Sequence, residues 1–198
     1  TAISVGGLGK FSANDLKKAL AGKNISMDFG LKTYSENISG KSNIKDLETA
    51  LQLLYLNFTS VRNDPQTYAS FASRANSVFA NLGNNPMVAF SDSIMNAMYM
   101  NNPRGRFINA ENIGKADYET MLKLYKERFA NAGKFVFTIV GNVNPEEFKP
   151  LAEQYIASIP GYAEKSTFNP NAMKARKGKF DNHFTRALET PKASSAIV

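Results

Sequence analysis

The sequence offers few side chains that could serve as a base, a nucleophile or a metal ligand. It contains one histidine, His183, and no cysteine, which excludes disulfides, thiolate zinc sites and cysteine nucleophiles. A Ser-His-Asp triad or a histidine-glutamate metal site needs imidazole as its base or ligand. His183 lies beside Phe180 and Phe184 in a predicted strand, which favours a surface or packing role. We therefore predict no catalytic residue, no cofactor-binding residue and no metal ligand in this chain.

The glycine-rich run Gly6-Gly7-Leu8-Gly9 is a further motif that we considered as a ligand site. It has neither the Gly-x-Gly-x-x-Gly spacing of a dinucleotide-binding loop nor the Lys-Ser/Thr ending of a phosphate-binding loop. The run therefore predicts a turn. The methionines between Met87 and Met100 are typical of adaptable core packing. No pair of carboxylates stands out as the acid and base of a glycosidase.

The positive charge of the chain is concentrated near its end. Lys and Arg number 24 against 17 Asp and Glu, which gives a formal net charge of +7. Residues 165–192 hold seven of the basic residues, and their acidic residues are Asp181 and Glu189. A solvated linker or strand face explains this segment more simply than a nucleic-acid groove. We expect no nucleic-acid partner. We also expect no membrane span, because no stretch approaches the roughly 20 apolar residues that one needs.

The first half of the chain is predicted to be mostly helical. Apolar residues at helical spacing, with capping residues or proline at the start, predict helices over residues 12–21, 46–59, 65–82 and 86–100. Alternating apolar and polar residues over 24–43 predict a β-hairpin, with its turn at Glu36-Asn37.

The second half combines helices with β-rich stretches. After a loop over 101–114, helices are predicted over 116–130 and 145–159. Between them, residues 135–140 are apolar at nearly every position, which predicts a central strand covered on both faces. We divide the chain into a main α+β part over 1–161, a linker over 162–177, and a second β segment over 178–198. Its two predicted strands cover 178–188 and 193–198, and the last ends within an apolar run, so we expect this segment to be truncated.

Several phrases of the sequence resemble one family. They are Gly6-Gly7-Leu8-Gly9-Lys10-Phe11-Ser12, Asp46-Leu47-Glu48-Thr49, and the strand-turn-helix phrase from Phe137 to Phe148 (FTIVGNVNPEEF). Over about residues 6–198 the chain resembles the second, degenerate half of the pitrilysin or insulinase-type zinc peptidases. The resemblance implies an α+β half-domain with a mixed sheet covered by several helices. It also implies a partner half in the same polypeptide that closes with this one around a peptide substrate.

The resemblance assigns the chemistry to the other half. There, an H-x-x-E-H helix and a distant glutamate hold zinc and activate water. Here the predicted helix over 65–82, where that distant glutamate would fall, contains no acidic residue. We therefore expect a non-catalytic, substrate-enclosing portion of a zinc metalloendopeptidase, with zinc in the catalytic half of the parent protein and a periplasmic or cell-envelope location. The alternatives are a scaffold or assembly subunit of the same fold and, least favoured, a nucleic-acid binder.

Overall fold

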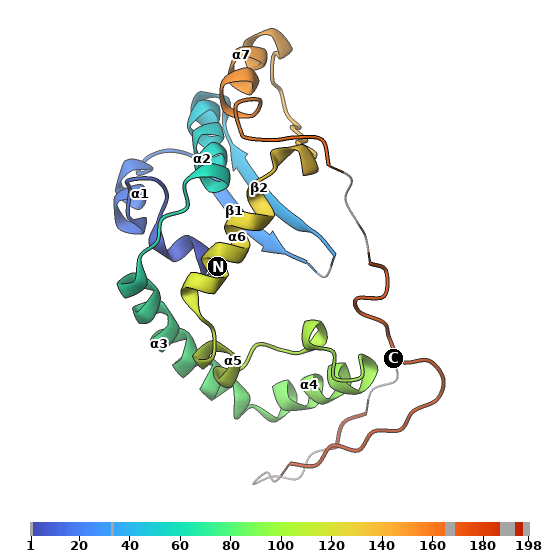
Figure 1. Ribbon diagram of the computed structural model, residues 1–198. Helices are drawn as coiled ribbons and strands as arrows, with labels where there is room; N and C mark the ends of the chain where they lie inside the picture. The colour runs from blue at the N-terminus through green and yellow to red at the C-terminus, as the bar shows by residue number, and fades with distance from the viewer. Residues whose placement is uncertain (1, 33, 165–168, 187–192, 196–198) are drawn as a thin grey trace.

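The structure is a computed structural model, and it describes residues 2–32, 34–164, 169–186 and 193–195. A β-hairpin and four helices form the upper part of the molecule in Figure 1, and three further helices form an arc below. The upper elements are α1 (Ala13–Ala19), β1 (Ile25–Leu31), β2 (Glu36–Ser42), α2 (Leu47–Thr59), α6 (Tyr118–Phe129) and α7 (Pro145–Tyr155). The arc contains α3 (Pro65–Gly83), α4 (Pro86–Met98) and α5 (Ala110–Gly114). Short 3-10 helices lie at Ile3–Gly6, Ile44–Asp46, Pro103–Gly105 and Ala132–Lys134.

Side-chain caps explain where the helices begin. Ser12 and Asp15 form a capping box at the start of α1, in which each side chain satisfies a backbone N–H of the other residue. Asp64 accepts from the Thr67 N–H at 3.0 Å before α3, and Asp117 accepts from the Thr120 N–H at 2.8 Å before α6. The predicted helices are therefore present, with α7 ending earlier than expected, at Tyr155. The short α5 lies inside the stretch that we expected to be a loop.

The hairpin is present, but its turn lies elsewhere than predicted. β1 and β2 pair antiparallel from Ile25↔Ser42 to Leu31↔Glu36, so Glu36 and Asn37 belong to the second strand. The Lys32 N–H donates to the Ser35 carbonyl at 2.8 Å and closes the connection instead. This register places Phe29 opposite Ile38, and both side chains pack against the core. The burial of this pair outweighed the turn preference of Asn37.

The core lies where α2, α6 and the N-terminal turn meet. Its buried residues are Leu8, Leu53, Val61, Tyr118, Leu122, Tyr125 and Phe129, with Phe129 only 1% exposed. The Phe129 ring stacks on Tyr125 with centroids 4.4 Å apart and on Phe135 at 5.1 Å. Stacked and edge-on rings of this kind add to the stabilisation that burial provides. The α+β class is confirmed, and the sheet of the described residues is a two-stranded antiparallel hairpin.

The prediction of a central, doubly covered strand over 135–140 is wrong for this structure. The backbone there is extended, but it pairs with no strand among the described residues. Val136 and Val140 are each 92% exposed, whereas Phe135 and Phe137 are half-buried against Phe58 of α2. One face of the segment is thus half-covered by α2, and no described element packs on the other face.

The end of the chain also differs from the prediction. Residues 178–186 contain no strand, and the remainder of the predicted strands falls mostly outside the described residues. Instead this segment lies along α4. Arg176 donates from its backbone N–H to the Met98 carbonyl at 2.7 Å, and Arg186 donates to the Gly83 carbonyl at 2.8 Å. The Arg176 Nε also donates to the Ala97 carbonyl at 3.1 Å, so both guanidinium groups lie at the negative, C-terminal ends of helices, which accounts for part of the local basic excess. The three-part division of the chain stays a prediction.

The methionine-rich helix is only partly covered. Met87 is 48% exposed, and Met100 just beyond the helix is 53% exposed, so neither is the core filler that we expected. No helix among the described residues is both long enough and apolar enough to cross a membrane.

Candidate functional site

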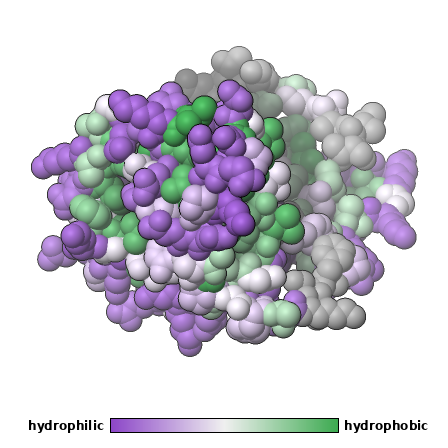
Figure 2. Space-filling model, turned by 90° about the horizontal axis from the view of Figure 1, so that it is seen from above, coloured by the Kyte–Doolittle hydropathy of each residue, from purple (hydrophilic) through white to green (hydrophobic). Residues whose placement is uncertain are grey.

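A long groove separates the hairpin from the extended segment over 135–143. One wall is β2 and the other is residues 135–143, and the volume between them is about 1450 Å³. Pockets for small ligands usually enclose about 300–1,000 Å³, so this groove is larger than a compact ligand requires. Figure 2 shows apolar side chains exposed among polar ones on one face of the molecule.

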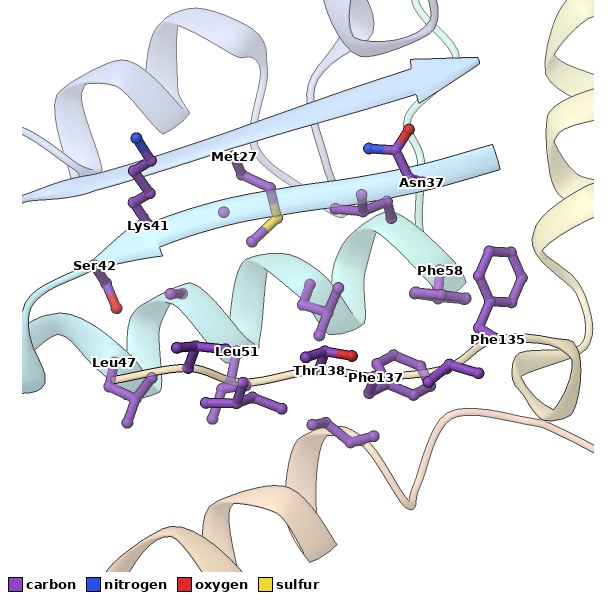
Figure 3. A pocket seen from close by; sticks show the side chains of 18 of the residues that line it. Met27, Asn37, Lys41, Ser42, Leu47, Leu51, Phe58, Phe135, Phe137 and Thr138 are labelled. Carbon is purple, nitrogen blue, oxygen red and sulfur yellow. The ribbon is translucent and has the colours of Figure 1, made fainter. Parts of the chain in front are cut away.

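Helix α2 forms the floor of the groove. Its apolar stripe of Leu47, Leu51, Leu54 and Phe58, which recurs at helical spacing, lines the groove together with Ala50. Figure 3 shows Leu47, Leu51 and Phe58 along this floor, between β2 and the extended segment. Leu53 of the same helix belongs to the core cluster. Helix α2 therefore presents apolar side chains in two directions, towards the core and towards the groove.

A buried asparagine positions the extended wall. Asn131 is 3% exposed, and its side-chain oxygen accepts from the Gly133 N–H at 3.0 Å and the Tyr162 N–H at 2.8 Å. The Ala132 N–H donates to the Pro160 carbonyl at 2.9 Å. These bonds join the chain before the wall to the chain after α7, so the direction of the wall is set at its first residue.

We expect Asn131→Ala to lower the free energy of unfolding by about 1–3 kcal/mol, because two backbone donors lose their acceptor. Urea unfolding followed by circular dichroism measures the change. Asn142→Ala is the matched control, since Asn142 is exposed in the same groove, and it should stay within about 0.5 kcal/mol of the parent. Equal stability of the two variants would mean that Asn131 does not hold the wall.

Ion pairs lie along the edges of the groove. Arg128 meets Glu36 at 3.2 Å, and Lys134 meets Glu164 at 2.8 Å. The hydrogen bond from Lys134 holds the pKa of the Glu164 carboxyl below its usual value. These are exposed pairs, so each contributes little to stability. In the part of the chain that the structure describes, the groove holds no group of three or more acidic side chains that could bind a metal ion.

At the other end of the groove, a buried carboxylate holds the hairpin against α2. Asp46 is 5% exposed and accepts from the Asn24 backbone N–H at 2.9 Å, just before β1 begins. This bond is the main cause that lowers the pKa of Asp46, and Lys23 at 3.6 Å adds to it. The Asn43 side chain accepts from the Asp46 N–H at 2.8 Å. The position of β2 over the floor thus depends on contacts at both ends of the hairpin.

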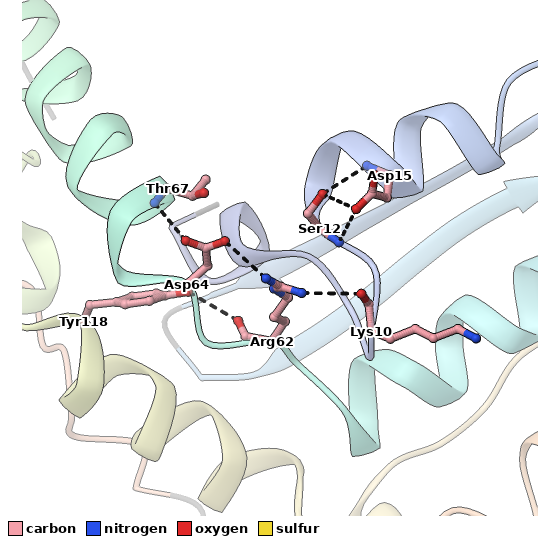
Figure 4. Close-up of polar contacts among 7 residues, drawn as sticks. All are labelled: Lys10, Ser12, Asp15, Arg62, Asp64, Thr67 and Tyr118. Atoms are coloured by element: carbon pink, nitrogen blue, oxygen red, sulfur yellow. Dashed lines mark hydrogen bonds and ion pairs between the residues drawn. The ribbon is translucent and has the colours of Figure 1, made fainter.

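A second polar cluster, shown in Figure 4, lies on the side of the N-terminal turn. Arg62 donates to the Lys10 carbonyl at 3.4 Å and meets Asp64 at 3.7 Å, while the Tyr118 hydroxyl donates to the Arg62 carbonyl at 3.4 Å. The hydrogen bond from the Thr67 N–H is the main cause that lowers the pKa of Asp64. These contacts join the α2–α3 connection to the glycine turn and to α6, or cap a helix, so the cluster is structural.

The one histidine of the sequence lies outside the groove and outside the second polar cluster. His183 is exposed on the segment beside α4, and it does not face the groove. Among the described residues, no group of three or more His, Cys, Asp or Glu could hold a metal ion. The expected lack of a metal ligand stays a prediction.

Comparison with known proteins shows which family this chain resembles. Residues 115–194 match the profile described as the peptidase M16 inactive domain, a range that includes α6, the extended wall and α7. Over 188 residues, 94% of the chain, the sequence is 26% identical to a "Zinc protease PQQL-like" protein of Arabidopsis thaliana. Over residues 115–194 the chain is similar to the M16 peptidase family. This confirms the resemblance to the pitrilysin and insulinase type.

Solved structures share the fold of this chain. The periplasmic protease PqqL of Escherichia coli matches 88% of the chain with a TM-score of 0.70 at 20% identity. The ferredoxin protease FusC, solved as a mutant with Arabidopsis ferredoxin, matches 84% with a TM-score of 0.60 at 13% identity. A Helicobacter pylori protease matches 83% with a TM-score of 0.59 at 13% identity. At these identities the likeness concerns the fold alone.

The chain spans only a part of the length of these proteins. It covers 20% of the length of the Arabidopsis relative, 19% of PqqL, 18% of FusC and 40% of the Helicobacter pylori protease. The part that it covers includes a domain described as inactive. The functional prediction is therefore supported in its coarser part: residues 115–194 are similar to the inactive domain of a peptidase family.

Sequence reasoning did not single out the residues that shape the groove. Asn131 follows a helix and precedes Ala132-Gly133, a pattern that indicates only a turn residue. Its burial depends on Tyr162, which is distant in sequence. No local sequence pattern could therefore predict the hydrogen bonds by which Asn131 positions the wall. The α2 stripe was predicted, but the side of the helix that stays open was not.

Proposed function

We propose that this chain is the non-catalytic, substrate-enclosing portion of a zinc-dependent metalloendopeptidase. The observation that carries the proposal is the match of residues 115–194 to the inactive domain of the M16 peptidases. The likeness in fold to three proteases over more than four fifths of the chain supports it. In this proposal the zinc and the water-activating glutamate belong to another part of the polypeptide, which is the main partner of this chain.

The sequence of α3 supports the proposal that the zinc site lies in another part of the polypeptide. The helix runs for 19 residues from Pro65 to Gly83 and contains no Asp or Glu. A catalytic zinc site uses three protein ligands and an open position for water, and carboxylate or imidazole groups must supply the ligands here. We further propose a periplasmic or cell-envelope location, which rests on the location stated for PqqL.

The proposal is tested on the full-length polypeptide with His183→Ala, which removes the one imidazole of this chain. We expect one zinc per polypeptide and peptide hydrolysis that a chelator abolishes and added zinc restores. His183→Ala should leave both the zinc content and kcat/KM unchanged, because the metal is held elsewhere. Zinc content by mass spectrometry and cleavage of a quenched fluorescent peptide measure these outcomes.

Two results would contradict the proposal in different ways. Loss of zinc in the His183→Ala variant, with folding intact, would place a metal site in this chain. A folded full-length polypeptide that neither retains zinc nor hydrolyses peptides would instead favour a scaffold or assembly subunit of the same fold. Lys123→Ala, a substitution on the exposed face of α6, serves as the control for purification losses.

A further inference from the structure

The arc of helices α3, α4 and α5 is not anchored by buried residues of its own. All three helices are described in full, and none of their residues is buried. At the end near the core, Tyr68 of α3 stacks on Tyr118 of α6 with ring centroids 4.3 Å apart, and the Tyr68 hydroxyl donates to the Ala116 carbonyl at 3.3 Å. Segments with few buried apolar contacts open more readily than a core. The position of the arc therefore depends on contacts at its far end, around α4.

A connecting segment, residues 172–176, joins that far end of the arc to the hairpin. The Tyr34 hydroxyl, at the tip of the hairpin, donates to the Met173 carbonyl at 3.0 Å. The neighbouring carbonyl, that of Ala172, accepts from the Asn102 side chain at 2.9 Å, just beyond the end of α4. Figure 1 shows the chain passing from the region of the hairpin tip to the end of α4. Adjacent carbonyl groups of one segment thus bind the hairpin and the arc.

The last residue of the connecting segment caps α4. Arg176 donates from its backbone N–H to the Met98 carbonyl at 2.7 Å and from its Nε to the Ala97 carbonyl at 3.1 Å. The last carbonyls of a helix have no partner within the helix and carry the negative end of its dipole. The Arg176 guanidinium also lies over the Phe180 ring, 3.8 Å from its centroid, which helps to hold it in place. The cap of α4 is therefore supplied from a distant part of the sequence.

The turn that follows α4 is strained. Met100 and Asn101 have φ angles of +53° and +58°, a region that residues with a side chain adopt at a cost. Such conformations persist where the surrounding structure holds them. Here the next residue, Asn102, donates to Ala172 of the connecting segment and accepts from the Arg104 N–H at 3.0 Å. The connecting segment thus holds both the last turn of α4 and the strained residues after it.

We propose that the connecting segment is a latch, which ties the tip of the hairpin to the end of α4 and fixes the arc of helices in its position. When the latch is released, the strained turn relaxes and the arc moves about the contact between Tyr68 and Tyr118. The hairpin tip and the arc are coupled through this segment, so a change at one alters the other. The inference concerns the motion of the fold and does not depend on the proposed peptidase function.

Hydrogen exchange of the full-length polypeptide, followed by mass spectrometry, tests the latch. Arg176→Ala removes the charged donor to α4, and we expect exchange over 86–98 to become roughly tenfold faster or more, while exchange over 118–129 in the core stays unchanged. Lys177→Ala is the matched control, because Lys177 is exposed next to Arg176 and its loss removes the same charge. Equal exchange over 86–98 in the parent and in Arg176→Ala would overturn the proposal.

A variant at the hairpin tip tests the coupling. Tyr34→Phe removes the donor to the Met173 carbonyl, and we expect exchange over 86–98 to become about threefold faster or more, because the loosened connecting segment holds α4 less firmly. Lys32→Ala, an exposed substitution at the same tip, should leave exchange over 86–98 as it is in the parent. An effect of Tyr34→Phe that is confined to the hairpin would overturn the coupling.

Glycine at position 100 tests whether the latch holds strain. Glycine adopts a positive φ without the cost that methionine carries, so Met100→Gly leaves the turn with less tendency to relax. We expect Arg176→Ala to speed exchange over 86–98 by less than about threefold in the Met100→Gly background, since the two substitutions act on one element. An effect of Arg176→Ala that is equally large in both backgrounds would show that the turn stores no strain that the latch holds.

Spin labels distinguish movement of the arc from loosening of α4 alone. Ala80→Cys on α3 and Lys126→Cys on α6 place labels at exposed positions of the arc and of the core, in a full-length polypeptide whose other cysteines are replaced. We expect a single narrow distribution of label distances in the parent and a broader or shifted one with Arg176→Ala. An unchanged narrow distribution would overturn the proposal. If Arg176→Ala does not fold, Tyr34→Phe is measured in its place and decides the question in the same way.

Discussion

Replacing Phe129 with Ala is expected to lower the free energy of unfolding by about 3–5 kcal/mol, the range for a fully buried phenylalanine. The Phe129 side chain is 1% exposed and contacts four aromatic rings, those of Phe29, Phe58, Tyr125 and Phe135, with centroids 4.4–5.4 Å apart. Its removal leaves a cavity that these rings can fill only by leaving their positions. Denaturant unfolding at equilibrium measures the loss.

The same substitution has a consequence for the groove. Phe135 begins the extended wall, and Phe58 belongs to the floor, so both depend on Phe129 for their packing. Leu124→Ala is the matched control on the same helix, because Leu124 is 51% exposed and should cost less than about 1 kcal/mol. A loss below about 1.5 kcal/mol for Phe129→Ala would show that the ring cluster is not the centre of the core.

Gly7→Ala is expected to be the most damaging single-methyl addition in the chain, with a loss of about 3 kcal/mol or more. Gly7 is buried with φ at +93°, a region that residues with a side chain seldom adopt. An added Cβ would overlap the Phe11 carbonyl oxygen and lie 2.7 Å from the Ser12 carbonyl carbon. Both are backbone atoms of a turn that is bonded to residues 60–62, through Gly9 N–H to Ser60 and Arg62 N–H to Gly7.

Gly22→Ala separates the two causes. Gly22 also has a positive φ, at +77°, but an added Cβ would meet no atom within 4 Å. It should cost only about 1 kcal/mol, from backbone strain alone. A thermal or urea melt of both variants gives the difference, which reports the steric clash at Gly7. Equal losses would mean that the turn relaxes, and that its contact with the α2–α3 connection is weak.

The buried phenol of Tyr125 illustrates how the core restricts chemistry. Its hydroxyl donates to the Asn57 carbonyl at 2.8 Å, and burial raises its pKa well above the usual value. The phenol therefore stays neutral and serves as a donor within the core. The perturbed groups near the groove, Asp46 and Glu164, are likewise explained by the bonds that position its walls.

The sequence by itself determined the helices, because their starts depend on local chemistry. Ser12, Asp64, Asp117 and Asn144 each cap a helix through a donor two or three residues away, so the signal and its effect lie within one turn. The family was also recognisable from the sequence, since short phrases such as FTIVGNVNPEEF do not depend on tertiary contacts. The absence of a second imidazole limited the possible chemistry in the same direct way.

Only the tertiary structure decided which apolar faces are covered. The run over 135–140 carries the same strand preference whether or not a partner lies beside it, but its burial depends on residues far away in sequence. The structure leaves Val136 and Val140 exposed, holds Phe135 and Phe137 on α2, and opens the groove between this segment and β2. The hairpin register was decided in the same way, since the pairing of Phe29 with Ile38 against the core moved the turn away from Asn37.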